Sequence, residues 1–300
     1  MQSQPIHFNP STQEAPKLLL PVPASVFAER AERFTTLAEG HSLQAWLLFL
    51  AHLSRAQHEV LAALPGLALP DAAAIERSLE HGMPPLDPAA PPPVWREALR
   101  QLLARLADAV PDAGRAALER LGTADDAQLD HLAAQLLDGA TGPEDAAALP
   151  LIAAALQVVF TGLASRLDAS RVRPLGETRV CPCCGSPAVA SIVRLGSEIN
   201  KLRYLHCSLC NTEWNLARAV CSSCGSDAGV ALQQIEGGNG VVQAETCDSC
   251  HGYLKLVHQD QEPRVDPVAD DLATLALDIL VDESGYARTG PNLLLIGAQG

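Results

Sequence analysis

Aromatic side chains are scarce in this sequence. Only 4% of its 300 residues are Phe, Trp or Tyr, although 48% are hydrophobic. A core formed by this chain must therefore consist mostly of Ala, Leu and Val. Ala and Leu have high helix propensity, so the composition favours helical structure. The length allows two domains, or one domain with a small additional module.

Cysteine is missing from the first 180 residues. All nine cysteines lie between residues 181 and 250, most of them in CxxC pairs. Cysteines that form disulfide bonds do not require the CxxC spacing. In a chain without a secretion signal, clustered CxxC pairs are typical of metal ligands.

The chain shows neither a clear export signal nor a membrane span. Residues 18–28 are apolar, but Pro21 and Pro23 interrupt them, and we do not expect a cleaved signal peptide. Residues 146–165 carry no charge over the length of a membrane span. They are mostly Ala and contain Gln157, which favours a buried core helix. We therefore expect a cytoplasmic protein with no membrane insertion.

Positive charge is in short supply. The formal net charge is −14, which makes nucleic acid an unlikely partner for the chain as a whole. The charge is unevenly distributed, however. Residues 171–218 contain seven basic and three acidic residues, whereas residues 227–288 contain three basic and twelve acidic residues. The basic stretch leaves a local contact with nucleic acid open.

Sequence signatures of common enzymes are absent. The sequence contains no nucleophile elbow, P-loop, HExxH motif or dinucleotide-binding fingerprint. A metal closed off by four thiolates offers no open coordination position for hydrolysis. We therefore expect no catalytic residues, no further cofactor site and no enzymatic activity.

Hydrophobic periodicity predicts a mainly α protein with five segments. Residues 1–20 look irregular, and residues 21–175 are expected to form an all-helical domain, since their apolar residues recur with the period of a helix. Pro84–Pro93 holds six prolines and should break the helices. Residues 176–216 and 217–262 form two metal modules. Residues 263–300 contain a C-terminal helix, with Asp270 and Asp271 in its solvated first turn.

The cysteine modules are two copies of one unit. In each copy, two CxxC pairs are separated by 22 residues, and each paired cysteine recurs 40 positions later. Gly185 and Gly225 follow the second cysteine of each copy and permit the left-handed backbone of a tight turn. The first site is predicted to use Cys181, Cys184, Cys207 and Cys210, and the second Cys221, Cys224, Cys247 and Cys250. A cross-braced pairing of the four CxxC units is the alternative.

Several neighbouring residues allow two interpretations. Cys183, His206 and His251 could act as ligands, but each module already has four sulfurs, so we expect none of them to bind metal. Tyr204, Trp214 and Tyr253 are expected to pack around the metal loops. Four thiolates suit zinc or iron, and spacing alone favours zinc. Residues 181–185, however, fit the CPxCG pattern typical of rubredoxin.

The C-terminal half resembles the formate dehydrogenase accessory protein FdhE family. The resemblance covers roughly residues 180–295, whereas the first 170 residues match only in being helical. Its motifs are Cys181-Pro182-x-Cys184-Gly185-Ser186, Arg203-Tyr204-Leu205-x-Cys207-x-x-Cys210, Thr212-Glu213-Trp214, Arg218-x-x-Cys221-x-x-Cys224, Cys247-x-x-Cys250, Tyr253-Leu254-Lys255, 270–275, 277–278, 285–286 and 292–294.

This resemblance implies a function. It implies a helical domain followed by two rubredoxin-like modules that hold one ferric iron ion each, with zinc as the alternative. It also implies a cytoplasmic protein that binds the catalytic subunit of a respiratory formate dehydrogenase and assists its maturation. A zinc-ribbon nucleic-acid binder and an iron–thiolate electron carrier are the alternative functions.

Overall fold

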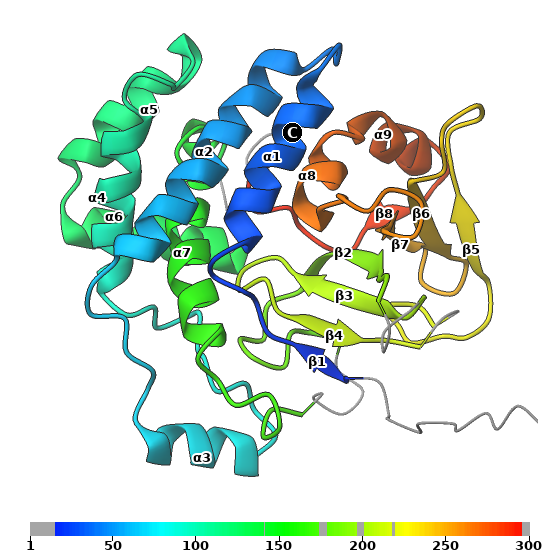
Figure 1. The fold of residues 1–300 in the computed structure, drawn as a ribbon, viewed down its shortest axis with the longest axis horizontal. Coiled ribbons are helices and arrows are strands. Elements are labelled where there is room, and N and C mark those ends of the chain that lie inside the picture. Colours follow the sequence, from blue (N-terminus) through cyan, green and yellow to red (C-terminus); the bar gives the residue numbers. More distant parts are fainter. Residues whose placement is uncertain (1–15, 141, 174–178, 197–200, 218–219, 296–300) are drawn as a thin grey trace, which may run out of the picture.

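A layer of helices packs against one mixed sheet in the computed structural model of this protein (Figure 1). The structure describes residues 16–140, 142–173, 179–196, 201–217 and 220–295. The N-terminal helices lie on one side of the molecule, and the strands with the C-terminal helices lie on the other. The helical layer contains α1 (Val26–Ala38), α2 (Gln44–Ala63), α3 (Ala72–Glu80), α4 (Val94–Leu106), α5 (Asp112–Thr123), α6 (Asp126–Asp138), a 3-10 turn (Pro143–Asp145) and α7 (Leu149–Ala164).

Helix α7 is the centre of the helical layer. Every residue from Leu151 to Ala164 is buried, because apolar residues cover all sides of this helix. Helices α2, α4 and α6 pack around it. The prediction of a buried core helix within residues 146–165 is confirmed. In the part of the chain that the structure describes, no helix is both long enough and apolar enough to cross a membrane.

The proline-rich connector leads from the helical layer to the first cysteine pair. Helix α3 ends at Glu80 and α4 begins at Val94, so Pro84–Pro93 breaks the helices as predicted. The connector does not separate two domains. The Leu86 amide donates a hydrogen bond to the Cys183 carbonyl over 3.0 Å, so the connector packs directly on the first cysteine turn.

The sheet consists of two similar halves. Its order is β1-β4-β3-β2-β7-β6-β5, with β8 beside β7. The strands are β1 (Leu18–Leu19), β2 (Ala188–Val193), β3 (Arg203–Cys207), β4 (Glu213–Asn215), β5 (Val230–Gln233), β6 (Val242–Cys247), β7 (Gly252–His258) and β8 (Ala287–Arg288). Strands β2–β4 form one antiparallel unit and β5–β7 another. Parallel pairing of β2 with β7 joins the two repeats into one sheet.

The prediction of a mainly α fold is wrong. The two four-cysteine groups are present, but the described residues form an eight-stranded sheet that contains β1 and the strands of residues 188–288. Strand β2 is buried at every position, and β7 at all positions except its last. Strands covered on both faces show no alternation of polar and apolar residues, which is the signal by which a strand is recognised in a sequence.

Both ends of the chain also differ from expectation. Within the segment expected to be irregular, residues 1–15 lie outside the described residues, but Leu18–Leu19 form β1 and pair with β4. The single C-terminal helix is in fact two short helices, α8 (Pro267–Leu272) and α9 (Leu275–Glu283). Asp270 and Asp271 are buried rather than solvated, because each has a basic partner.

Buried ion pairs join the helical layer to the C-terminal segment. Arg30 on α1 donates to Asp266, the N-cap residue of α8, over 3.0 Å. One turn later on α1, Arg33 donates to Asp270 over 2.6 Å. A buried charge is tolerated only when it is paired and hydrogen-bonded. These pairs therefore specify how α1 lies on α8.

A second group of buried charges holds the C-terminal helices on the sheet. Lys255 on β7 is fully buried and lies 3.3 Å from Asp271, and its ammonium donates to the Asp271 carbonyl over 2.8 Å. Arg288 donates to the second oxygen of the same carboxylate over 2.8 Å. Burial disfavours the charged form of Asp271, but Lys255 and Arg288 hold the pKa of its carboxyl below the ordinary value.

We expect Lys255→Met to lower the free energy of unfolding by about 3 kcal/mol, because it leaves buried carboxylates without one of their cations. Urea denaturation followed by circular dichroism at pH 7 measures the change. Arg115→Ala is the control: Arg115 forms an exposed pair with Asp112 on one helix, and its loss should leave the midpoint unchanged. Equal midpoints for Lys255→Met and the unmodified protein would contradict this role.

Candidate metal centres

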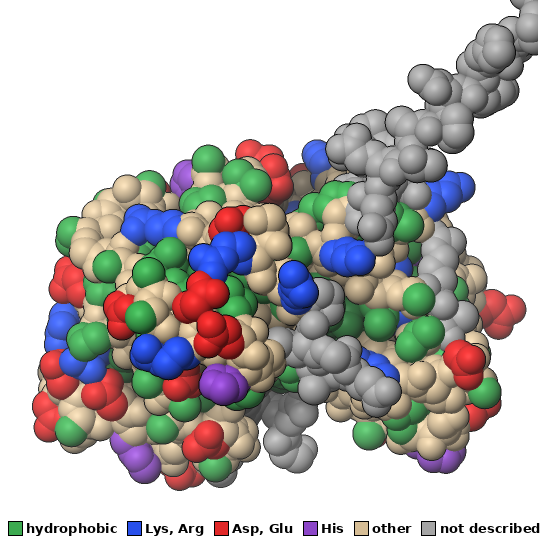
Figure 2. Space-filling view, turned by 90° about the horizontal axis from the view of Figure 1, so that it is seen from below, with side chains coloured by type: hydrophobic (Ala, Val, Ile, Leu, Met, Phe, Trp, Pro, Cys, Tyr) green, Lys and Arg blue, Asp and Glu red, His purple; other side chains and the backbone are tan. Residues whose placement is uncertain are grey.

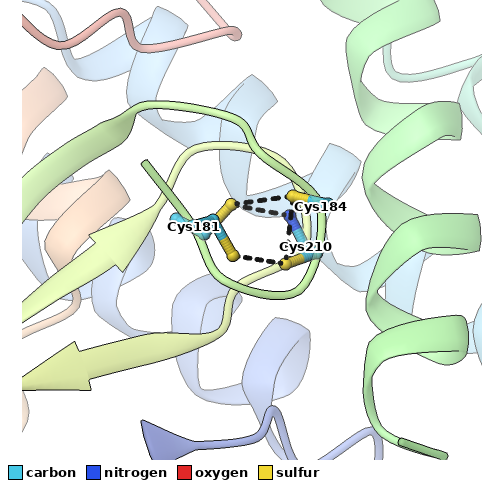
Figure 3. A group of neighbouring side chains, drawn as sticks. Cys181, Cys184 and Cys210 are labelled. Carbon is cyan, nitrogen blue, oxygen red and sulfur yellow. Dashed lines mark hydrogen bonds between the residues drawn. The ribbon is translucent and has the colours of Figure 1, made fainter. Parts of the chain in front are cut away.

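The first four predicted sulfurs meet at one point between β2 and β3. Cys181 and Cys184 lie on the turn before β2, and Cys210 lies on the turn that follows β3 (Figure 3). Cys207 is the last residue of β3. The four sulfur atoms all lie within 4.8 Å of one another. The Cys181–Cys210 and Cys184–Cys207 sulfurs are 3.5 Å apart. We call this group the first site.

The second repeat places its sulfurs in the same way. Cys221 and Cys224 precede β5, and Cys247 and Cys250 lie at the end of β6. The Cys221–Cys250 and Cys224–Cys247 sulfurs are 3.7 Å apart. We call this group the second site. Each group takes all its sulfurs from one repeat, so the cross-braced alternative does not describe this structure.

Both sets of distances suit a four-thiolate metal ion. Zinc–sulfur bonds are about 2.3 Å long, so a regular tetrahedron around the ion has edges of about 3.8 Å. The measured edges of 3.5 Å and 3.7 Å are close to this value. The sulfurs therefore lie where an ion of this kind needs them, and the two groups could each hold one.

Left-handed backbone closes each cysteine turn. Gly185 and Gly225, singled out in the sequence, have φ values of 77° and 79°. The second turn of each repeat has no glycine at the matching position. There, Asn211 and His251 adopt φ values of 58° and 53°. Asn and His adopt this conformation more often than other non-glycine residues, whereas a β-branched residue would be strained there.

Backbone amides donate hydrogen bonds to cysteine sulfurs in both sites, although burial still raises the pKa of the Cys207 thiol. The amides of Leu209 and Cys210 donate to the Cys207 sulfur over 3.4 and 3.3 Å. In the second site, burial raises the pKa of the Cys247 thiol, but the backbone amides of Cys250 and Ser249 outweigh it and lower the pKa to about 7. A thiol must lose its proton before it can bind a metal ion.

The residues with two interpretations lie outside both sulfur groups. His206 is buried, and its ring contacts Glu213 over 2.9 Å and Asn211 over 3.1 Å. Cys183 is fully buried and takes part in the contact with the connector. The exposed His251 packs against Tyr286, with ring centroids 6.1 Å apart. None of the three contributes an atom to a four-sulfur cluster.

The three aromatic residues beside the cysteines pack into the sheet and its surroundings. Tyr204 and Tyr253 are buried, and each directs its hydroxyl to a protein acceptor. Tyr204 donates to the Pro16 carbonyl over 2.8 Å, and Tyr253 donates to Asp278 over 2.8 Å. Trp214 belongs to the main hydrophobic core. They are therefore structural side chains.

The sequence did not reveal the polar contacts that hold the first site on the helical layer. Gln157 on α7 donates to the Ser208 carbonyl over 2.8 Å, inside the second cysteine turn. Asn211 donates to Thr161 of α7 over 2.7 Å and accepts from Arg30 over 2.8 Å. Gln157 and Thr161 are one helical turn apart in an otherwise apolar helix. This spacing places both on one face, and it was the feature of the sequence that could have indicated a polar contact there.

We expect His251→Val to lower the free energy of unfolding by about 1–2 kcal/mol, because a β-branched residue fits poorly at φ 53°. His251→Gly should cause no loss. Urea denaturation of the metal-bound protein provides the comparison. His81→Val is the matched control, since His81 is also exposed but has φ −90°. If valine is tolerated equally at both positions, the conformation of residue 251 does not strain a β-branched side chain.

Comparison with known proteins places the whole chain in one family. The family descriptions "FdhE, N-terminal", "FdhE, central domain" and "FdhE, C-terminal domain" match residues 15–177, 180–218 and 219–295. The protein FdhE homolog of Rhizobium meliloti is 38% identical, with 99% of this chain and 100% of the relative covered. That of Pseudomonas aeruginosa is 40% identical over 90% of each chain.

A solved structure shows the same likeness. The crystal structure of the FdhE protein from Pseudomonas aeruginosa matches with a TM-score of 0.85 and 39% sequence identity, and the match covers 93% of this chain and 99% of that chain. The similarity therefore extends from the helical layer to the C-terminal helices. This chain belongs to the FdhE family.

Proposed function

We propose that this protein is a non-catalytic accessory factor for a respiratory formate dehydrogenase. It binds the catalytic subunit in the cytoplasm and assists its maturation through a body that carries two metal–thiolate sites. Membership of the FdhE family supports this proposal, and so does the resemblance of the cysteine motifs to formate dehydrogenase accessory proteins. The observation that carries it is the pair of preformed four-sulfur clusters, built into one sheet.

We propose that the eight paired cysteines are the metal ligands and that each site holds one ferric iron ion, with zinc as the alternative. The sulfur-only donor set and the tetrahedral spacing fit either ion. The CPxCG sequence at residues 181–185 favours iron. A ferric four-thiolate site can accept one electron, and the cysteines of this chain keep all four coordination positions occupied. This arrangement supports a recognition or redox role rather than hydrolysis.

A nucleic-acid-binding function receives little support from the surface. Two arginines of the basic stretch are committed to acidic partners, Arg194 to Glu213 and Arg203 to Glu245. The Glu213 carboxylate is buried, but Arg194 and His206 lower its pKa to about 2, so it stays charged at neutral pH. On the face shown in Figure 2, acidic side chains lie among the basic ones. A nucleic-acid backbone needs a continuous basic surface.

We expect about two iron ions per chain in the untagged protein purified without added metal. Elemental analysis and a visible spectrum measure this, and the ferric-thiolate colour should fade on reduction. Cys184→Ser should lower the content to about one ion, whereas Cys183→Ser should retain two, because Cys183 lies outside the sulfur group. Two colourless zinc ions would remove iron from the proposal, and no bound metal would remove the sites altogether.

We expect the metal-bound protein to retain the catalytic subunit of formate dehydrogenase, without formate turnover by the accessory protein itself. Co-purification from cells that produce both proteins tests this. The affinity tag alone, expressed with the catalytic subunit, gives the background. Retention of RNA or DNA that disappears with added salt, in place of the subunit, would favour the nucleic-acid alternative. Rapid reversible reduction by a redox partner without subunit binding would favour the electron carrier.

A further inference from the structure

The two sulfur clusters differ in exposure although their sequences are duplicated. In the first site, Cys181, Cys207 and Cys210 are fully buried, and Cys184 is 1% exposed. In the second site, one cysteine of each turn reaches the surface. Cys224 and Cys250 are exposed, whereas their partners Cys221 and Cys247 are buried. Half of the second cluster is therefore open to molecules in solution.

The cover of the first site comes from the helical layer. Gln157 of α7 binds the turn that contains Cys207 and Cys210. On the other turn, the proline-rich connector binds the Cys183 carbonyl, and Pro84 would lie 3.2 Å from a Cβ atom placed on Gly185. All four sulfurs belong to the main hydrophobic core. Because these cysteines are at most 1% exposed, direct attack on their sulfurs requires local opening of the surrounding structure.

The second site lies away from that layer. Figure 1 shows β5 and β6 at the end of the sheet opposite to α2 and α7. Polar side chains, rather than a helix, contact its two turns, and Arg179 donates to the Ser223 carbonyl of the first turn over 3.1 Å. Ser249 donates to Ser226 over 2.9 Å, and Tyr286 donates to Asp248 over 2.7 Å. Ser249 and Asp248 are themselves exposed, so these contacts do not bury Cys224 and Cys250.

We propose that the second site is the exchange site of this protein, at which a thiol of a partner replaces Cys224 or Cys250 on the bound metal ion, while the first site retains its ion during the exchange. The inference rests on the proposed metal binding and holds for either zinc or iron. It assigns different tasks to two copies of one sequence unit. The first copy stabilises the fold, and the second copy is the point of contact with thiol-bearing molecules.

The exchange step balances without an oxidant or reductant. With an ion bound, a partner thiol would take the ligand position of Cys224 or Cys250, and that cysteine would be released. The proton that the partner thiol gives up is taken by the displaced cysteine thiolate. The ion keeps four sulfur ligands and its charge. Buried Cys221 and Cys247 continue to hold the ion during this step.

Charge around the second site narrows the class of partner. Four thiolates around a divalent or trivalent ion carry a net negative charge. Asp227 and Asp248 are exposed and lie within three residues of ligand cysteines, so they add to it. Arg179 donates to the Ser223 carbonyl of the first turn over 3.1 Å and offsets one of these charges, so the local charge remains negative. Opposite charge speeds association and like charge slows it. The site therefore favours a thiol in neutral or basic surroundings, such as a protein cysteine flanked by Lys or Arg.

The test uses the full chain loaded with two zinc ions. The protein is mixed with excess 4-(2-pyridylazo)resorcinol, which reports released zinc, and with N-ethylmaleimide, which caps displaced cysteines. We expect one zinc ion per chain to leave at least about tenfold faster than the other, because only the first site must open locally before attack. Mass spectrometry should find the early label on Cys224 and Cys250, whereas the four cysteines of the first site should remain unlabelled.

Variants separate the two sites. Cys250→Ser should hold one zinc ion and lose the fast phase. Gln157→Ala removes the hydrogen bond to the Ser208 carbonyl and should accelerate the slow phase while leaving the fast phase unchanged. If a variant fails to fold, the labelling pattern of the unmodified protein still decides the question.

Three results have distinct meanings. Release of both zinc ions at one rate, or early labelling of the first four cysteines, would overturn the exchange proposal while leaving metal binding intact. A chain that binds no metal would overturn the proposed metal sites themselves. Binding of two zinc ions with a fast phase, but without retention of a formate dehydrogenase subunit, would contradict only the identity of the client.

Discussion

The contact between α7 and the first four-cysteine cluster is the constraint on which the rest of the structure depends. Helix α7 is apolar on all sides and must be buried, and the cluster lies in the same hydrophobic core. Gln157 and Thr161 are the polar groups through which this helix holds the second cysteine turn. Their partners, the Ser208 carbonyl and the Asn211 side chain, are buried. Any other arrangement of helix and sheet would leave these polar groups buried without a hydrogen bond, which costs free energy. The contact therefore specifies one orientation of sheet and helices.

Duplication explains the rest of the sheet. Each repeat forms an antiparallel three-stranded unit that leaves open edges, and an unpaired edge exposes backbone donors and acceptors. Parallel pairing of β2 with β7 removes one edge from each repeat, and β1 covers the outer edge of β4. Helix α7 contacts the first repeat, whereas α9 lies against β6 of the second repeat. The same sequence unit consequently has a buried cluster in one copy and a half-exposed cluster in the other.

Buried charge takes the place of large aromatic side chains at the junctions. The pairs of Arg30 with Asp266 and of Arg33 with Asp270 connect α1 to α8, and Lys255 connects β7 to the segment around α9. Such pairs contribute modestly to net stability, yet breaking one is expensive because the remaining charge stays buried. In a chain with few aromatics they provide directional contacts that Ala and Leu cannot provide.

The sequence by itself determined both sulfur groups, the closing role of Gly185 and Gly225, and the buried α7. Cysteine spacing and charge-free helical runs are local patterns, which can be recognised from the sequence alone. Only the tertiary structure decided that β2 and β7 are central strands, that Asp270 and Asp271 are buried, and that Cys224 and Cys250 are exposed while Cys184 and Cys210 are not. Those properties depend on which distant surface covers each residue, and two repeats with equal spacing carry no local sign of that difference.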